Sequence, residues 1–504
     1  MFRMLRKHPR VSKQRTALVL GLLLVGLVGC GTTVPLAQQS SAALSGGDGL
    51  GGVTPTQGST AGTGGAVADL GGTTGSALSS SGGPTTGVPT DFATTAAGGG
   101  PTAVLAGQDH SPVKVAVFHI NGGNAVLSAA FPGSSVSFGD GKREATAIIN
   151  EVNARGGAGG HKMIPTFIPV EATGGDDAGL QKACQGAVQD VHPMAIFAMF
   201  NLADGLAACA KKAGVLLIDV ALGAGDDHIY DTSRDIVFSP SQMTRNAEQT
   251  LIIGLARAAG KLPAGEPVGI LSESDVPLYG RVVKSTIEPL LTKLGVPYIE
   301  QDLSNGADTS GMNAAVLKFL TSGVDTVLFS LGSGGIPEVL FMNAAEQQQF
   351  RPAYLMGDST DTSFVGGTSP AAQIKRIWGA GTYPLANVRV DQYPSSPREK
   401  KCLATLDKAI GGYNNRGSSL TGTLYCEIVE SFAFVAGKVS GKLTTASWAQ
   451  AYHRLGVGYQ AVTTFSTDFL PRRMDGASAY RLLGFGQACA CITYLSPIRR
   501  IPAL

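Results

Sequence analysis

The residues that could ligate a metal or carry out catalysis are few and poorly grouped. Asp226-Asp227-His228 offers two carboxylates and an imidazole. Adjacent side chains in a loop diverge, however, and no second ligand cluster accompanies them, so we expect a solvated loop here. The chain has no H-E-x-x-H, G-x-S-x-G or G-x-x-x-x-G-K-[ST] motif. The sequence therefore predicts a protein that is not an enzyme and has no cofactor and no metal, with a hydrolase triad assembled only by geometry as the alternative.

Six of the seven cysteines fall into three close pairs. The pairs are Cys184 with Cys209, Cys402 with Cys426, and Cys489 with Cys491. The members of the first two pairs lie in expected helices, and one disulfide within each pair is the simplest interpretation for an oxidising compartment. The third pair forms a Cys-Ala-Cys sequence that could close a small loop or stay reduced. A zinc half-site would need a partner pair that the sequence lacks.

The seventh cysteine, Cys30, follows a segment with the composition of an export signal. Basic residues between Lys7 and Arg15 precede the apolar run from Ala17 to Gly29, which is shorter than the about 20 residues that span a bilayer. The ending Leu27-Val28-Gly29-Cys30 resembles the lipobox of bacterial lipoproteins. We expect residues 1–29 to be a signal peptide and Cys30 to carry a lipid anchor on the outer side of the cell membrane. An ordinary signal peptide that contains a cysteine is the alternative.

Composition separates a linker from a folded region. The chain has 504 residues, a net charge of +2 and only 15% charged residues. It therefore lacks the excess of basic residues that is typical of nucleic-acid-binding proteins. Residues 30–112 are mostly Gly, Ser, Thr and Ala and cannot bury enough apolar surface to fold. We expect a lipid-anchored, disordered linker with an end-to-end span of roughly 50 Å.

From residue 113 onwards, apolar strands alternate with amphipathic helices. The first series contains strands at 113–120, 162–170, 194–200 and 215–220 and helices at 141–154, 178–190 and 203–213. A second series contains strands at 267–272, 298–301, 326–331 and 354–357 and helices at 280–294, 312–322 and 337–348. Alternation of this kind predicts parallel βαβ units, and two series predict two α/β lobes.

At this point the sequence resembles a known family. The segment from Val152 to Lys162, with Gly156-Gly157-Ala158-Gly159-Gly160 at its centre, is similar to the glycine turn of type I periplasmic-binding proteins. Within that family, the sequence resembles the branched-chain amino acid, amide and urea receptors of ABC importers. Ala213-Gly214-Val215, Val237-Phe238-Ser239-Pro240-Ser241, Tyr279-Gly280 and Ser322-Gly323-Val324-Asp325 also match. The Cys184–Cys209 pair fits a disulfide of the first lobe in some relatives.

The resemblance implies a fold and its division. It implies an α/β protein of two Rossmann-like lobes with parallel sheets, joined by three crossover hinge strands. The solute-binding domain would span residues 113–504, with lobe one at 113–238 and 355–460 and lobe two at 239–354 and 461–504.

The resemblance also implies ligand contacts in the loops that follow the strands. The implied contacts are Asn121, Asn124, Asn201, Leu202, Ala221 and Leu222 from lobe one, and Asp275, Tyr279, Ser330 and Gly332 from lobe two, with Asp358 after the next strand as a further candidate. Ordinary structural roles are the alternatives for several of them: a helix N-cap for Asn201, turn formation for Asp275 and Asp358, and packing for Tyr279.

Two departures from the amino acid receptors affect the expected ligand. Hydroxyl side chains that hold the ligand carboxylate in those receptors are missing after the third and fourth strands, and the loop Asn124–Gly139 is longer. We therefore expect capture of a small polar solute, such as an amino acid or an amide, for an ABC permease in the membrane. A ligand sensor or cell-surface binding module on the same fold is the alternative.

Overall fold

The computed structural model describes residues 110–130, 137–171, 177–200, 202–220, 224–262, 265–332 and 334–502. All of them belong to one compact unit, Gly100–Leu504. Cys30, the expected signal peptide and the expected linker lie outside these residues. Among the helices of the described part, none is long and apolar enough to cross a membrane.

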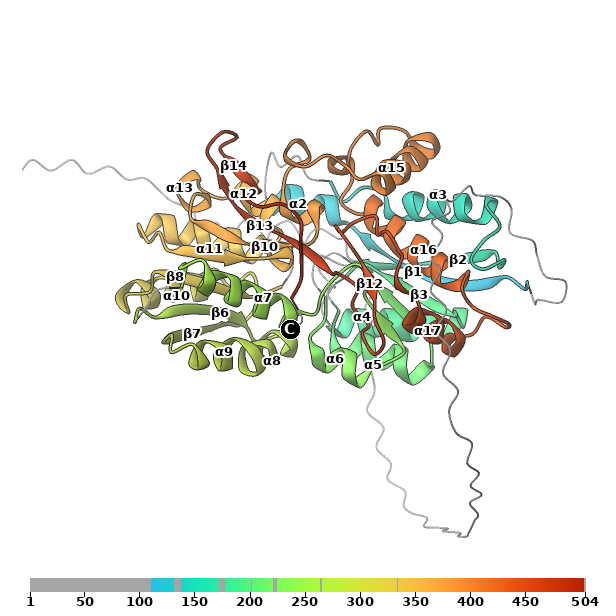
Figure 1. Ribbon diagram of the computed structural model, residues 1–504, viewed down its shortest axis with the longest axis horizontal. Coiled ribbons are helices and arrows are strands. Elements are labelled where there is room, and N and C mark those ends of the chain that lie inside the picture. Colours follow the sequence, from blue (N-terminus) through green and yellow to red (C-terminus); the bar gives the residue numbers. More distant parts are fainter. Residues whose placement is uncertain are drawn as a thin grey trace, which may run out of the picture. The chain divides into compact units, whose positions relative to one another are not determined.

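Lobe one is built on a parallel sheet with the strand order β2-β1-β3-β4-β5. Its strands are β1 (Val113–Asn121), β2 (Met163–Glu171), β3 (Ala195–Ala198), β4 (Leu216–Asp219) and β5 (Val237–Phe238). Its helices are α2 (Gly123–Ala130), α3 (Gly141–Ala154), α4 (Asp177–Gly186), α5 (Asp204–Ala213), α6 (Asp227–Thr232), α15 (Pro397–Ile410), α16 (Gly422–Ala436) and α17 (Thr445–Arg454). The helices α3 and α16 cover one face of this sheet and α4 and α5 the other, as Figure 1 shows.

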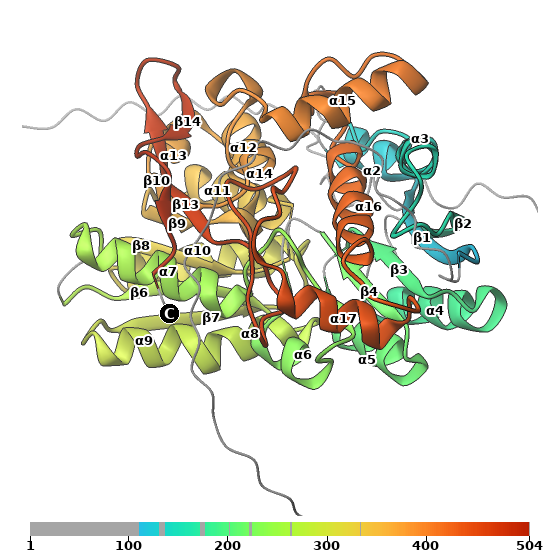
Figure 2. The ribbon, with the colours of Figure 1, turned by 45° about the vertical axis from the view of Figure 1, so that its right-hand side comes forward.

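Burial on both faces explains the composition of these strands. Val115, Ala116, Val117 and Phe118 are consecutive and fully buried in β1, which is typical of a parallel strand covered on both sides. The last two helices of the lobe come from far along the sequence. The helix α16 contacts β3 and β4, and α17 lies next to α16 (Figure 2). Phe197 contacts Phe432 of α16 with ring centroids 5.2 Å apart, and Phe238 of β5 contacts Trp448 of α17 at 5.0 Å. Distant parts of the chain therefore complete the core of lobe one.

Lobe two is built on a mixed sheet with the order β14-β13-β10-β9-β8-β6-β7, to which β15 adds at β13. Its strands are β6 (Val268–Glu273), β7 (Tyr298–Leu303), β8 (Thr326–Ser330), β9 (Ala353–Met356), β10 (Ile377–Gly381), β13 (Ala479–Gly486), β14 (Cys491–Tyr494) and β15 (Arg499–Arg500). Its helices are α7 (Arg245–Ala258), α8 (Pro277–Val282), α9 (Glu288–Lys293), α10 (Thr309–Thr321), α11 (Ile336–Gln347), α12 (Thr362–Thr368), α13 (Ala371–Ile374) and α14 (Pro384–Asn387). The five strands from β6 to β10 are parallel, whereas β13 and β14 are antiparallel.

The chain passes between the lobes three times, as the resemblance implied. The passages are residues 239–244, 389–396 and 455–478, and the third contains the short strands β11 (Gly456–Val457) and β12 (Asp468–Phe469). The first and third passages are joined by hydrogen bonds from Ser239 N to Met474 O at 2.7 Å and from Gly476 N to Gln242 O at 2.9 Å. The predicted α/β fold with two lobes is confirmed.

The division between the lobes differs from the prediction from residue 355 onwards, and also at Val462 and Phe469, which were assigned to lobe two but pack in the core of lobe one. We assigned residues from 355 onwards to lobe one, but β9 pairs with β8, and β10 pairs with β9, in the second sheet. The assignment of this segment was wrong because the apolar pattern of a buried strand does not reveal which sheet it joins. Part of the expected long loop after β1 is also the helix α2.

The glycine turn adopts a conformation that explains its composition. Gly156, Gly157, Gly159 and Gly160 all have positive φ angles, between 60° and 106°. A Cβ atom on Gly157 would lie 2.2 Å from the carbonyl oxygen of His161. The reversal between α3 and β2 therefore requires glycine, both for its backbone angles and for close approach.

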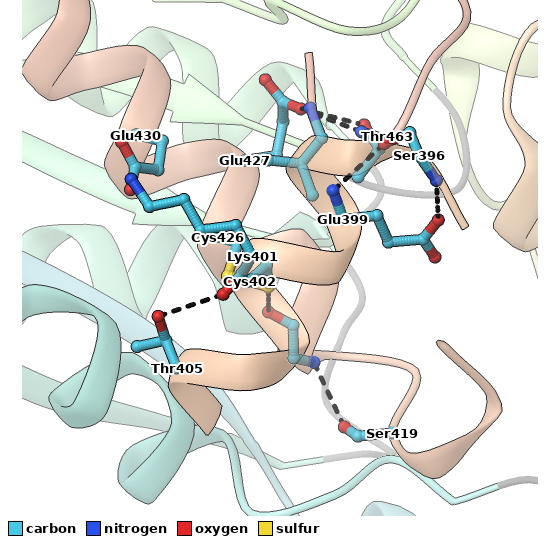
Figure 3. Close-up of a disulfide and its surroundings, with 12 residues drawn as sticks. Ser396, Glu399, Lys401, Cys402, Thr405, Ser419, Cys426, Glu427, Glu430 and Thr463 are labelled. Carbon is cyan, nitrogen blue, oxygen red and sulfur yellow. Dashed lines mark hydrogen bonds between the residues drawn. A yellow bond between two sulfur atoms is a disulfide. The ribbon is translucent and has the colours of Figure 1, made fainter. Parts of the chain in front are cut away.

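Three disulfides are present among the described residues. Cys184–Cys209 joins α4 to α5, and Cys402–Cys426 joins α15 to α16. Figure 3 draws the Cys402–Cys426 disulfide together with the hydrogen bonds from Thr463 to Glu427. These two disulfides confirm the predicted pairs. The pair left open by the sequence, Cys489–Cys491, is also bonded. In the chain-entropy model, the stabilisation of the folded state by a disulfide grows with the length of the loop that it closes. It is about 3.5 kcal/mol for each of the first two bonds but only about 1.6 kcal/mol for the third.

Candidate functional site

A cavity of about 510 Å³ lies between the two lobes. Lobe one contributes the segments just before α3 and α16, and lobe two contributes α12 and the chain that follows β10. The lining residues are Ser137, Asp361, Ser363, Phe364, Gly367, Thr368, Leu385, Val388, Arg389, Val390, Asp391, Arg416, Gly417 and Leu420. The volume falls in the range of about 300–1,000 Å³ that is typical of small-molecule sites.

The walls of this interlobe cavity combine apolar surface with a few polar groups. Phe364, Leu385, Val388 and Leu420 provide the apolar part. Hydroxyl groups come from serine and threonine residues on both lobes. Sites with this composition bury the apolar body of a ligand and orient it through a small number of hydrogen bonds.

Asp361 is the buried carboxyl group of the cavity. It caps α12 by accepting a hydrogen bond from Phe364 N at 3.1 Å, and its φ angle is +41°. Burial raises the pKa of its carboxyl group to about 7, although the backbone N–H groups that it accepts from oppose the shift. At neutral pH this residue can therefore present either a carboxylate or a neutral carboxyl group to the cavity.

Arg416 places a positive charge in the opposite wall. Its side chain is 2% exposed, and Nη2 donates to the carbonyl oxygen of Arg389 at 3.3 Å. Its Nη1 lies 3.8 Å from an oxygen of Glu399 and has no hydrogen-bond acceptor among the described residues. The Arg389 side chain is paired with Asp391 at 2.7 Å. The cavity thus contains one buried guanidinium that is only loosely neutralised.

The predicted contacts at Leu202, Tyr279 and Ser330 lie elsewhere, in a seam where the lobes touch. Leu202 is 1% exposed, Tyr279 is 1% exposed and Ser330 is 2% exposed. Ser330 Oγ donates to the carbonyl oxygen of Tyr279 at 3.0 Å, and Tyr279, although part of lobe two, packs in the hydrophobic core of lobe one. Here the side chains of the protein itself occupy the space between the strand ends.

Arg245 closes this seam. Its guanidinium carbon lies 4.9 Å from the centre of the Tyr279 ring. Its Nε donates to the carbonyl oxygen of Ala224 in lobe one, and its Nη1 donates to that of Leu331 in lobe two, both at 3.2 Å. Burial raises the pKa of the nearby Glu273 carboxyl group to about 7, and the Gly332 backbone N–H, another predicted contact, donates to this carboxyl group.

The other predicted contacts have structural partners or lie outside the described residues. Asn121 donates to Glu171 at 2.9 Å. Asn124 accepts from Phe138 N at 2.8 Å and so lies next to Ser137 of the cavity. Asp275 is exposed.

Asp358 connects two strand ends of lobe two. Its carboxyl group accepts from Thr382 N at 2.9 Å and from Asn387 Nδ2 at 2.8 Å, which ties the end of β9 to the segment after β10. Three further predicted contacts, Asn201, Ala221 and Leu222, lie outside the described residues.

A salt-bridge clasp joins the lobes beside the seam. Arg281 of α8 pairs with Asp204 through Nη1 and with Asp226 through Nε, each at 2.7 Å. Asp226 also caps α6 by accepting from Ile229 N and is 2% exposed. The expected solvated loop was therefore wrong for Asp226, because its carboxylate is buried against a cation that lies far away in the sequence. Asp227 and His228 are exposed, as expected, but they lie in the first turn of α6.

No group of three or more His, Cys, Asp or Glu side chains within the described ranges is arranged to hold a metal ion. The cavity residues after β9, after β10 and before α16 were missed by sequence reasoning. The only local indication was the pattern Asp361-Thr362, in which an aspartate precedes a helix.

Comparisons with known proteins bear on the fold. No protein-family model matches the sequence, and no curated protein matches it significantly. Among solved structures, a branched-chain amino acid ABC transporter protein of Thermus thermophilus with bound valine is 16% identical, with a TM-score of 0.57, over 78% of this chain and 97% of that chain. The branched-chain amino acid transporter substrate-binding protein of Streptococcus pneumoniae, in complex with isoleucine, is 15% identical, with a TM-score of 0.54, over 77% and 99%.

A third similar structure carries a different ligand. The solute-binding protein of an ABC transporter from Rhodopseudomonas palustris, in complex with p-hydroxybenzoic acid, is 14% identical, with a TM-score of 0.57, over 78% of this chain and 97% of that chain. The strand order, the three passages and these similarities agree, and the chain has the type I periplasmic-binding fold.

Proposed function

We propose that this protein is an extracytoplasmic solute-binding protein that captures a small polar solute between its lobes for an ABC permease. The observation that carries the proposal is the interlobe cavity, whose walls come from both lobes of a type I fold. A ligand that contacts both walls binds the closed arrangement better than the open one and therefore shifts the population towards closure.

The solutes seen in similar structures support the size and type of ligand. Valine, isoleucine and p-hydroxybenzoic acid are the ligands named for those proteins. The cavity here differs from a simple hydroxyl-lined carboxylate site because it places the buried Arg416 and the titratable Asp361 on opposite walls. Solutes to be tested should therefore include amino acids, amides, urea, polyamines, short peptides and hydroxybenzoates.

A glycine in the cavity wall gives a sharp test. Gly367 lies in α12, and a Cβ atom at this position would meet nothing within 4 Å, so a Gly367→Met side chain can enter the cavity without a backbone clash. We expect a solute that raises the melting temperature of the wild type to have no effect on this variant, because a ligand stabilises only a state that it binds.

The control is Gly254→Met, in the exposed part of α7, where a Cβ atom also has open space. Both substitutions remove a helical glycine, so both variants should fold with equal or slightly higher stability. Retained binding by Gly367→Met would show that the solute binds elsewhere. If no solute in the panel shifts the wild type, the proposed capture function fails.

Membrane attachment and the permease are separate parts of the proposal. If a lipid is attached at Cys30, the variant Cys30→Ala should no longer incorporate a fatty-acid label. The variant should also be released from the membrane fraction. Copurification of a permease with the labelled wild type supports transport. Solute binding without any such partner would favour a sensor or cell-surface binding module.

A further inference from the structure

The disulfide Cys489–Cys491 differs from the other two in its surroundings. It lies at the tip of the hairpin formed by β13 and β14, and β14 is the outer strand of its sheet. Cys184, Cys402 and Cys426 are at most 6% exposed and belong to the core of lobe one, and the half-buried Cys209 packs against that core. At the hairpin tip, Gln487, Ala488 and Ala490 are exposed and Cys489 is half-buried.

The hairpin does not depend on this disulfide for its register. Backbone pairing already runs from Leu483 opposite Tyr494 to Gly486 opposite Cys491. The bond has a sequence separation of 2, against 25 and 24 for the other two, so it restricts the unfolded chain least. A role in stability therefore explains the bond poorly.

The enclosed residue adds a backbone cost. Ala490 has a φ angle of +48°, which is a left-handed conformation that a residue with a Cβ atom rarely adopts. Reduction frees the two cysteines and lets this residue leave that region. Disulfides that are strained or exposed exchange readily with external thiols, and this one encloses a strained residue and is only half-buried at Cys489.

We propose that Cys489–Cys491 is a thiol–disulfide exchange site that takes electrons reversibly from an external dithiol. In the first step, a thiolate of the dithiol attacks Sγ of Cys489, because Cys489 is half-buried whereas Cys491 is only 4% exposed. A mixed disulfide forms, the bond between the two cysteines breaks, and Cys491 leaves as the thiolate and takes up a proton. The second thiolate of the dithiol then attacks the dithiol-derived sulfur of the mixed disulfide. This closes the disulfide of the oxidised dithiol and releases Cys489 as a thiolate. The dithiol is oxidised to a disulfide and the protein pair is reduced.

A redox titration of the folded chain tests the proposal. The protein is equilibrated with graded ratios of reduced and oxidised dithiothreitol, the free thiols are alkylated, and each cysteine peptide is quantified by mass spectrometry. We expect Cys489 and Cys491 to become reduced at a reduced-to-oxidised ratio at least tenfold lower than the ratio needed for Cys184–Cys209 or Cys402–Cys426. Equal resistance of all three disulfides, or earlier reduction of either of the others, would overturn the proposal.

A pair of single variants tests which sulfur is attacked. In Cys491→Ser the thiol of Cys489 is free, and in Cys489→Ser the thiol of Cys491 is free. With oxidised glutathione, we expect the mixed disulfide to form at least tenfold faster in Cys491→Ser, because Cys489 is the more exposed of the two residues. Equal or reversed rates contradict the assigned order of attack. Intact Cys184–Cys209 and Cys402–Cys426 peptides in both variants show that the free thiol has not exchanged with the other disulfides, and a melting temperature close to that of the wild type establishes that the fold is retained.

Discussion

Asp361 combines a structural and an electrostatic role in one side chain. It caps α12 from a left-handed backbone position and forms part of the cavity wall. The pKa of its carboxyl group is raised to about 7 by burial, above the value of about 3.9 for an unfolded chain. Between these two values the folded state holds a proton that the unfolded state has lost. The contribution of this residue to the free energy of unfolding therefore falls as the pH rises from 4 to 7. Above pH 7 the loss of stability is complete and no longer changes with pH.

Asp361→Asn should remove this cost while keeping the cap. Asparagine accepts the same hydrogen bond and tolerates a positive φ. We expect a gain in the free energy of unfolding at pH 8 that is on the order of 3–4 kcal/mol at most, with little change at pH 4. Urea unfolding at several pH values measures it.

The matched control is Asp391→Asn in the same cavity wall. The Arg389 guanidinium lowers the pKa of that exposed carboxyl group, so its titration lies below this pH range. If Asp361→Asn and the wild type lose stability equally between pH 4 and 8, Asp361 is not the group responsible.

The sequence located the strand ends but not the cavity. Tyr279 and Ser330 do follow strands at the interlobe surface, as predicted, yet they are buried where the lobes touch. Phe364 and Leu420 share the cavity although they come from different lobes. Periodicity within a segment places a residue on a strand or helix, but only tertiary packing determines which loops of the two lobes approach each other.

At the scale of helices, α8 contacts the beginnings of α5 and α6 through Arg281. Asp204 lies in the first turn of α5 and Asp226 is the N-cap of α6, so both carboxylates are also stabilised by the helix dipoles. The single arginine thus connects two helices of lobe one to lobe two. This clasp favours the closed arrangement of the lobes.

Arg281→Gln should weaken closure. Loss of the cation leaves the buried Asp226 without its partner, and we expect the closed state to lose about 1–3 kcal/mol relative to the open state. Hydrogen exchange at the start of α5 and α6 should increase, and the radius of gyration in solution should rise.

Lys284→Gln is the control for the clasp. Lys284 lies in the π-helical segment Val283–Ile287 that follows α8, but its partners, Glu288 and Glu300, belong to the same lobe. Its substitution should leave interlobe exchange unchanged. Equal exchange in both variants would mean that the clasp does not hold the lobes together.

The regular elements of lobe one were the most predictable part of the fold. The predicted helix over 141–154 matches α3, because its buried residues follow helical spacing and Asp140 caps it. The placement of β9 and β10 in the second sheet could not be predicted, since it depends on pairing with β8. The antiparallel strands β13 and β14 were also missed, because the buried residues of β13 come in pairs and do not alternate along the strand, and β14 has only four residues.

For the molecule as a whole, the two long-loop disulfides secure lobe one. Replacing Cys402 and Cys426 by alanine should lower the free energy of unfolding by about 3–4 kcal/mol, because the bond joins α15 to α16 across the core. Replacing Cys489 and Cys491 by alanine should cost less than half as much. Denaturant unfolding of both double variants measures the difference, and equal losses would contradict the assigned roles.

The division of lobe one into two separate stretches of chain has a consequence for its synthesis. The strands β1 to β5 are complete at Phe238, but α16 and α17, which cover one face of the sheet, end only at Ala436 and Arg454. At about 5–20 residues per second, a ribosome needs roughly ten to forty seconds to make the intervening chain. During that time Phe197 and Phe238 lack the aromatic partners Phe432, Trp448 and Tyr452. Lobe one is begun first but can complete its core only when α16 and α17 have been made. A nascent chain that remains unfolded until it is nearly complete is therefore favoured.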